Sequence, residues 1–236
     1  MTATAQEAST HVLGEPPILY FGTSVVLIST LNEDGSANLA PMSSAFWLGW
    51  RCVLGLAKGS QTTQNLLRDR ECVLNLPSDA QVAAVDRLAL TTGSLAVPAG
   101  KQRRGYRSER RKFETAGLTP APALVVTAPR AMECPVQMEG RVEGWHDLAQ
   151  EDPVLSGYAV IFEVRIERVH LSRNILREGN PDRVDTEKWR PLIMSFSKFF
   201  RLADGELHPS RLASIPEALY RSPDVDRARR TPPAPR

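Results

Sequence analysis

The sequence contains few cysteines and no long apolar run, and each absence excludes a class of protein. Only three of its 236 residues are cysteines, and none of them forms a CxxC pair. An odd number of isolated cysteines argues against a disulfide framework, so we expect Cys52, Cys72 and Cys134 to be buried, reduced thiols. No stretch approaches the roughly 18 unbroken apolar residues of a membrane span, which excludes a helical transmembrane protein.

Histidine is also scarce. The four histidines lie far apart, with neither an HExxH motif nor a Cys/His spacing that would gather ligands. No metal site is therefore predicted. The first ten residues are polar and small, without the basic start and apolar run of a secretory signal, and we expect a cytoplasmic protein.

Charge is nearly balanced over the chain but unevenly distributed. The 29 basic and 27 acidic residues give a net charge of +2, whereas KQRRGYRSERRK at residues 101–112 holds seven basic residues and one acid. Such a stretch is either a solvated surface or an anion-binding segment. Its single aromatic residue, Tyr106, disfavours a stacking platform for nucleic acid. We expect no nucleic-acid partner and favour an anionic dinucleotide.

The chain has enough apolar material, 42% of its residues, for one large domain. No internal repeat or linker separates two cores, so we predict a single domain over residues 14–220. Residues 1–13 are expected to form a flexible tail. Residues 221–236 are rich in proline and arginine and poor in apolar side chains, which predicts a second, disordered tail.

Short strand-like runs dominate the predicted structure. They are rich in Val, Ile and Leu and bounded by turn residues, and they span 24–30, 36–45, 52–57, 72–77, 134–146 and 158–170. The turn sequence NEDG predicts a hairpin between the first two. Helices are predicted at 62–69 and 80–89, with one further turn near 110–116. This pattern favours a mainly β protein with short helices, built on a closed or partly closed antiparallel barrel.

The segment KGSQTT follows a predicted strand and leads into a helix, which is an anion-binding layout. Gly59 allows close approach of the backbone, and the first amides of the helix point at the ligand. The hydroxyls of Ser60, Thr62 and Thr63 and the ammonium of Lys58 can complete a shell around a phosphate. The alternative interpretation is an ordinary Ser/Thr helix cap with a solvated lysine.

A second segment, NLAPMSSAF, is an apolar strand interrupted by Pro41. Because proline cannot donate to a β-ladder, this strand must have an edge or a bulge that a ligand or partner chain can approach. Ser43 and Ser44 either hydrogen-bond a polar ring or satisfy local backbone groups. The sequence lacks GxSxG, GxxxxGK[ST] and a GxGxxG that opens a helix, which disfavours hydrolase and Rossmann folds.

Five blocks in order along the chain resemble the flavin reductase-like family of FMN-binding split-barrel proteins, the group that includes flavoredoxin. The blocks are SVVLISTLNEDGSANLAPMSSAFW, LAKGSQTTQNLLRDRECVLNLP, KFETAGLTPAPALVVTAPRAMECPVQMEGRVE, FEVRIERVHL and KWRPLIMSFSKFF. The resemblance implies a Greek-key split β-barrel that forms a homodimer, with FMN held in a groove at the subunit interface.

The resemblance also assigns cofactor-binding positions. Those along the flavin ring and ribityl chain are Pro41, Met42, Ser43 and Ser44, and those at the phosphate are Lys58, Ser60, Thr62 and Thr63. It implies no catalytic acid or base, because the flavin ring carries the redox chemistry. The sequence WLGWR at 47–51 departs from the polar or proline-rich turn of many relatives, so the resemblance does not predict the identity of the substrate.

The activity implied is that of an NAD(P)H-dependent flavin reductase, which supplies or carries reduced FMN and takes NADH or NADPH as the donor. An oxygenase or an electron-transfer protein is then the expected partner. Two alternatives stay open. The first is a protein that keeps FMN as a prosthetic group for electron transfer or for transforming a small molecule, without using nicotinamide directly. The second is a non-catalytic module that binds flavin or another nucleotide.

Overall fold

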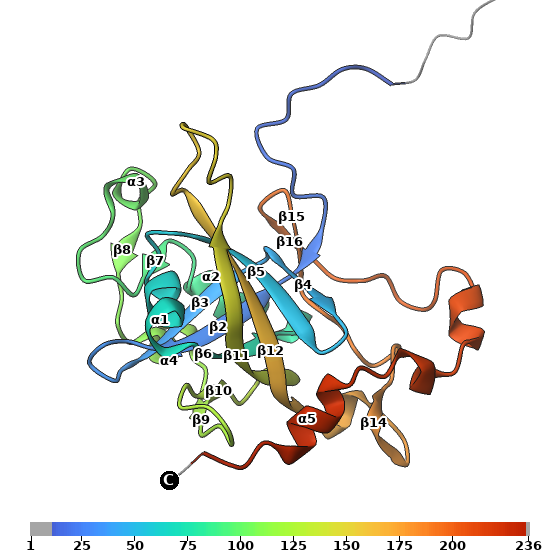
Figure 1. The fold of residues 1–236 in the computed structure, drawn as a ribbon. Helices are drawn as coiled ribbons and strands as arrows, with labels where there is room; N and C mark the ends of the chain where they lie inside the picture. The colour runs from blue at the N-terminus through green and yellow to red at the C-terminus, as the bar shows by residue number, and fades with distance from the viewer. Residues whose placement is uncertain (1–10, 235–236) are drawn as a thin grey trace, which may run out of the picture.

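A seven-stranded antiparallel sheet forms the centre of the computed structural model, which describes residues 11–234 (Figure 1). Its strands, in spatial order, are β3 (Ala37–Met42), β2 (Val26–Leu31), β6 (Glu71–Leu76), β11 (Val136–Asp147), β12 (Ala159–Leu171), β5 (Arg51–Ala57) and β4 (Ala45–Leu48). The two edge strands, β3 and β4, are consecutive in the chain, and no ladder joins them within residues 11–234. The result is a mainly β fold of the split-barrel class, as predicted.

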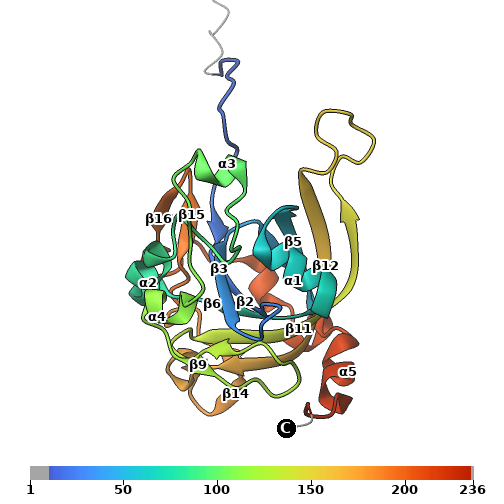
Figure 2. The same cartoon turned by 90° about the vertical axis from the view of Figure 1, so that its left-hand side faces the viewer.

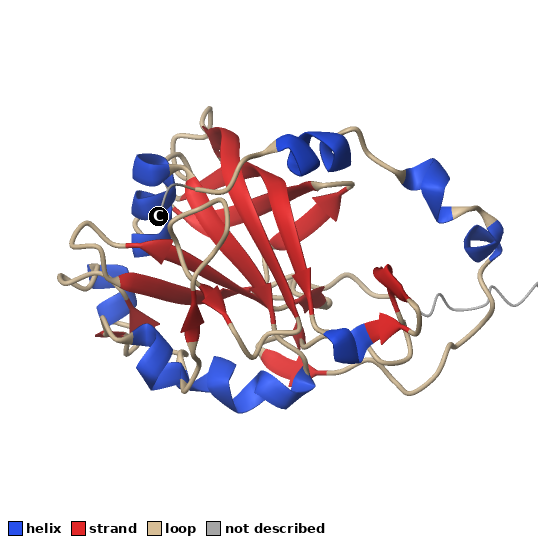
Figure 3. Ribbon diagram, turned by 90° about the horizontal axis from the view of Figure 1, so that it is seen from below, coloured by secondary structure: helices blue, strands red, loops and turns tan. Residues whose placement is uncertain are grey.

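Short helices surround the strands (Figure 3). They are α1 (Gln61–Asp69), η1 (Asp79–Gln81), α2 (Val82–Arg87), α3 (Ala99–Gln102), α4 (Lys112–Ala116), η2 (Arg173–Ile175), η3 (Arg211–Ser214), η4 (Glu217–Tyr220) and α5 (Asp224–Arg230). The remaining strands are short and form small sheets. They are β1 (Thr23–Ser24), β7 (Thr91–Thr92), β8 (Arg107–Ser108), β9 (Pro120–Ala121), β10 (Arg130–Ala131), β13 (Leu176–Arg177), β14 (Asn180–Val184), β15 (Ile193–Ser195) and β16 (Lys198–Phe200).

The predicted hairpin between β2 and β3 is confirmed. The amide of Gly35 donates to the carbonyl of Asn32 at 2.9 Å, and Gly35 has φ +79°, a conformation that glycine adopts at little cost. The predicted strand at 36–45 is instead divided into β3 and β4 by Ser43 and Ser44. There the chain crosses from one edge of the sheet to the other, so the ladder is interrupted.

The barrel interior is filled by alternate residues of each strand. On β5 these are Cys52, Leu54 and Leu56, which pack with Phe162 and Val164 of β12, as the period of two in a strand requires. A second core lies on the other face of β2 and β3 and holds α2 and α4 against the sheet. The second core thereby fixes the residues that begin α4.

The three cysteines are buried and free, as predicted. Cys52 and Cys72 lie in the barrel core, and Cys134 lies in the second core. Burial raises the pKa of Cys52 and of Cys134 to about 12. These thiols are therefore protonated and unreactive near neutral pH.

Most of the predicted N-terminal tail, residues 1–13, lies outside the described residues, and residues 11–13 are exposed without regular structure. The other end differs from the predicted disorder, because α5 packs on β12. Arg51 Nε lies 2.9 Å from Asp224 Oδ2, and Arg168 donates to the carbonyl of Ala228. These charge-assisted bonds order the helix where apolar burial alone cannot. No described helix is long and apolar enough to cross a membrane.

Candidate functional site

A cavity of about 590 Å³ opens at one end of the barrel. Its floor is formed by β3, by the outer face of β5 and by the start of α1, and one wall is formed by residues 88–93 and the chain around α3. The opposite wall comes from the base of the loop that joins β11 to β12. Figure 2 shows α3 and this loop standing on either side of the same end of the barrel.

The cavity brings together five of the eight predicted cofactor-binding residues. Those that line it are Pro41, Met42, Ser44, Ser60 and Thr62. Those that do not are Ser43, Lys58 and Thr63. The two segments that the sequence singled out, one before β4 and one before α1, therefore meet at one site.

Ser60 and Thr63 build the N-terminal cap of α1. Ser60 Oγ accepts a hydrogen bond from the Thr63 amide at 3.1 Å and lies 2.8 Å from Thr63 Oγ1, which donates to the carbonyl of Ala57 at 2.9 Å. Thr63 therefore does not face the cavity and supports it indirectly, by holding Ser60 and the carbonyl of Ala57 in place. The amides of Gln61 and Thr62 have no acceptor within the helix, and both residues line the cavity.

A buried polar network supports Thr62 from behind. Asn38 Nδ2 donates to Thr62 Oγ1 at 3.1 Å and to Thr30 Oγ1 at 3.3 Å, and Asn65 Nδ2 donates to the same Thr30 hydroxyl at 2.9 Å. The chain passes this network closely at Gly93, where a Cβ atom would lie 2.5 Å from Asn38 Oδ1. The network and the missing side chain at Gly93 together fix the position of the Thr62 hydroxyl.

Lys58 lies outside the cavity. Its Nζ is 2.6 Å from Asp147 Oδ2 on β11, and both side chains are partly exposed. Its role as a phosphate ligand, which the sequence predicted, would require the ammonium to leave this ion pair. An exposed pair of this kind contributes little to stability, so the exchange costs little.

Three cations line the cavity, namely Lys101, Arg104 and Lys112, and none of the described residues that line it is an aspartate or glutamate. Lys112, the first residue of α4, is only 1% exposed. Its ammonium donates to Thr91 Oγ1, and Lys101 Nζ donates to Thr92 Oγ1 at 3.3 Å. Two adjacent threonines thus bring two lysines to one place.

The electrostatic state of Lys112 reflects this arrangement. Burial, followed by the nearby charge of Lys101, lowers the pKa of Lys112 to about 8. Burial and the charge of Arg104 lower the pKa of Lys101. A buried cation without a carboxylate partner is unfavourable, and a bound anion would remove that penalty. The arrangement is therefore suited to an anionic group.

Sequence reasoning missed Lys112 as a site residue, although it ends the basic stretch that the sequence identified. The two tryptophans of the WLGWR segment, Trp47 and Trp50, pack against the barrel core, and neither lines the cavity. Within residues 11–234, no three His, Cys, Asp or Glu side chains gather into a metal-binding group.

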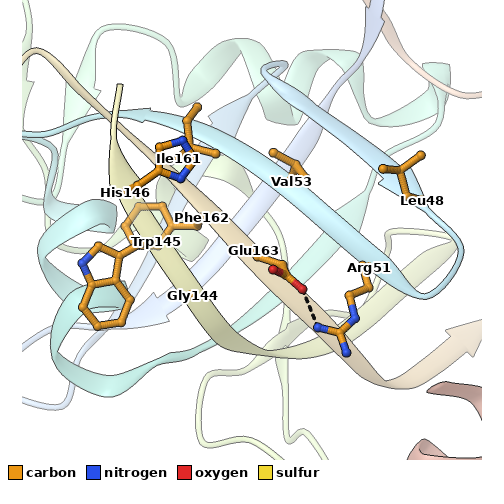
Figure 4. A pocket seen from close by; sticks show the side chains of 9 residues that line it. All are labelled: Leu48, Arg51, Val53, Gly144, Trp145, His146, Ile161, Phe162 and Glu163. Carbon is orange, nitrogen blue, oxygen red and sulfur yellow. Dashed lines mark hydrogen bonds and ion pairs between the residues drawn. The ribbon is translucent and has the colours of Figure 1, made fainter. Parts of the chain in front are cut away.

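A second hollow, a groove of about 660 Å³, lies on the outer face of β4, β5, β12 and β11 (Figure 4). It is lined by Leu48, Arg51, Val53, Gly144, Trp145, His146, Ile161, Phe162 and Glu163. An ion pair between Arg51 and Glu163 spans β5 and β12. Ile161 lines both the groove and the cavity, so the two hollows are neighbours on one face.

Comparison with known proteins places this architecture in a family. Residues 18–203 match the flavin reductase like domain, and the chain belongs to this family. It is 37% identical over 188 residues to the uncharacterized protein YdfE of Bacillus subtilis (strain 168), a match that covers 80% of this chain and 87% of that one. The family supports a flavin-related oxidoreductase.

The fold is shared with solved structures of other proteins. Flavoredoxin of Desulfovibrio vulgaris (Miyazaki F) has a TM-score of 0.67 at 21% identity, covering 87% of this chain and 99% of that chain. Nitrilotriacetate monooxygenase component B from Bacillus cereus has a TM-score of 0.65 at 18% identity, covering 84% and 99%. At these identities the likeness concerns the fold.

Proposed function

We propose that the cavity binds FMN and that the protein is an NAD(P)H-dependent flavin reductase, which supplies or carries reduced FMN. The observation that carries the proposal is the pairing of a nearly buried Lys112 with the free amides at the start of α1 in one cavity. Family membership makes a flavin the expected occupant.

The chemistry of the lining fits FMN at both ends. The phosphate would lie between the first amides of α1, the Thr62 hydroxyl and the ammonium group of Lys112, which suits a dianion. The isoalloxazine ring would lie along Pro41 and Met42 on β3. Ser43, Ser44, Ser60, Thr63 and Lys58 complete the proposed binding set, with Ser60 and Thr63 acting through the cap of α1.

FMN would supply the redox chemistry when bound, by accepting a hydride at its ring. The protein's own groups orient the ring and phosphate, and we assign no catalytic acid or base. At the mouth of the cavity, Lys101 Nζ and the Arg104 guanidinium lie 5.4 Å and 5.6 Å from the centre of the Tyr106 ring. These cations and this ring would attract NADH or NADPH, which are anionic and aromatic.

An oxygenase is the proposed acceptor of reduced FMN, since the structural neighbours include a monooxygenase component B. A second candidate function also has support, because flavoredoxin shares the fold. In that case FMN stays bound as a prosthetic group and passes electrons without direct use of nicotinamide. Retention of FMN through gel filtration favours this second function, whereas weak FMN binding with rapid NAD(P)H oxidation favours the first.

We further propose a homodimer formed through the groove face. The groove holds the apolar side chains Leu48, Val53 and Ile161, and Ile161 also lines the cavity. A second copy seated on this face would lie next to the cofactor and place FMN at the interface. Covering the groove would also remove an exposed apolar patch and shield the edge strand β4.

The binding site can be tested with two substitutions at helix caps. Aspartate is a good N-cap residue, so Ser60→Asp preserves α1 while placing a negative charge at the proposed phosphate. We expect FMN affinity, measured by quenching of flavin fluorescence, to fall at least tenfold with an unchanged Tm. Ser78 caps η1, does not line the cavity and provides the matched control Ser78→Asp. Equal FMN affinity in the two variants would contradict the proposed site.

A further inference from the structure

Residues 200–221, which we call the arm, bury no side chain against their own chain. Their contacts with it include exposed ion pairs, such as Glu217 with Arg183 at 3.0 Å. All of these residues are exposed, including those of η3 and η4. Leu207, Leu212 and Leu219 are 102%, 68% and 75% exposed. Figure 1 shows the arm, in orange to red, looping away from the barrel before it returns to α5.

The arm is fixed at both ends and differs in this respect from a loose tail. At its start, Phe200 pairs with Ile193 in the hairpin of β15 and β16. After its end, Arg51 holds Asp224, and α5 packs on β12. The two anchors set the path of the arm across the molecular surface.

The arm also has local structure of its own. Ser210 caps η3 by accepting from the Leu212 amide at 3.2 Å, and Pro216 precedes η4. Large apolar side chains recur along the arm, at positions that include Leu202, Leu207 and Ile215, and this composition differs from that of a disordered linker. A segment that is preorganised, anchored and apolar has the properties of a binding surface.

We propose that the arm packs on a second copy of this chain and clasps the homodimer. This inference rests on the homodimer proposed above, and it adds the element that holds the two copies together. The arm ends at the rim of the groove, because Arg51 both lines the groove and binds Asp224. Ser222 lies against the turn between β4 and β5, with its Cβ 3.3 Å from the position of a Cβ at Gly49.

Symmetry explains why a second copy is the fitting partner. In a two-fold dimer the same surface faces itself, so a groove-to-groove contact brings the base of each arm to the edge of the other subunit. Exposed apolar residues then lie on both surfaces, Leu212 and Leu219 on the arm and Phe46 and Leu48 on β4. Each arm would cover apolar surface on the other subunit, and its own apolar side chains would be buried in return.

The test is the monomer–dimer equilibrium of the full-length protein, measured by analytical ultracentrifugation. The double variant Leu212→Asp/Leu219→Asp should raise the dimer Kd at least 30-fold. The control His208→Asp/Ala213→Asp adds the same charge to exposed positions of the same arm and should change the Kd less than threefold. Equal Kd values for the two double variants would overturn the clasp.

A groove variant separates the clasp from the homodimer itself. If Leu48→Asp dissociates the dimer while Leu212→Asp/Leu219→Asp does not, the homodimer stands and the clasp is wrong. If the unaltered protein is a monomer at all concentrations, both proposals fail. A photo-crosslinking residue at position 212 gives a second measurement. Crosslinks to peptides of a second copy support the clasp, and crosslinks only within one chain overturn it.

Discussion

Lys112 donates a hydrogen bond from its buried ammonium to the hydroxyl of Thr91, and no carboxylate lies within ion-pair distance of it in the described part of the chain. On the neighbouring residue, Thr92 Oγ1 accepts a hydrogen bond from Lys101 Nζ. The charge of Glu109 favours the protonated form of Lys112 but does not outweigh burial and the charge of Lys101, so the cavity keeps a positive charge that is not ion-paired. Replacing Lys112 with an uncharged residue should therefore weaken the binding of an anionic ligand and stabilise the protein without ligand.

Lys112→Met should weaken FMN binding and stabilise the protein without ligand. A hydrogen bond to a charged group contributes about 1.5–3 kcal/mol, which corresponds to an affinity loss of about 10- to 100-fold. The same substitution removes a buried charge and should raise the Tm. Fluorescence titration and thermal unfolding measure the two effects. Arg111→Met, which changes an exposed neighbour, is the control, and a lower Tm with unchanged affinity in Lys112→Met would contradict the assignment.

The lowered pKa of Lys112, about 8, predicts a pH dependence with a definite sign. Between that value and the ordinary lysine pKa, the unfolded chain binds more protons at this position than the folded protein. The contribution of Lys112 to the free energy of unfolding should therefore rise as the pH rises from about 8 to about 10.4. Urea unfolding of the apoprotein and of Lys112→Met isolates this contribution as a difference. A difference that is constant from pH 7 to 10 would contradict the prediction.

Gly93→Ala should disturb the network that supports Thr62. The new Cβ would meet Asn38 Oδ1 at 2.5 Å, and overpacking of this kind costs about 1–3 kcal/mol. We expect a lower free energy of unfolding in urea and weaker FMN binding. Gly59 has no heavy atom within 4 Å of such a Cβ, so Gly59→Ala near the same helix is the control for the free energy of unfolding. Equal stability of the two variants would show that the network adapts.

The rim of the cavity, formed by Lys101, Arg104 and Tyr106, should control the affinity for NADH or NADPH. Replacing Lys101 and Arg104 with glutamine removes the cations beside Tyr106, and the KM for the preferred nicotinamide should rise while kcat changes little. The effect should shrink at high salt, because salt screens exposed charges. Replacing the exposed Arg103 with glutamine provides the control. Unchanged steady-state kinetics in the double variant would show that Lys101 and Arg104 do not bind the nicotinamide.

The sequence was sufficient to predict the strands, the first hairpin and the helix that begins beside Ser60, because these depend on local patterns. It also placed Pro41 and Thr62 at one site through the family resemblance. It could not identify Lys112, because the basic stretch contains seven cations and only packing of α4 on β3 buries one of them. The order of α5 was missed for a similar reason. Its partners, Arg51 and Arg168, lie far away in the sequence.

The central claim is that the cavity binds a flavin that nicotinamide reduces. The most direct test is the visible absorption spectrum of the full-length protein with FMN, recorded anaerobically before and after addition of NADH or NADPH. We expect binding to perturb the flavin spectrum and one nicotinamide, in preference to the other, to bleach the flavin band. Bound flavin that neither nicotinamide bleaches would contradict the reductase function, and an absence of flavin binding would contradict the site itself.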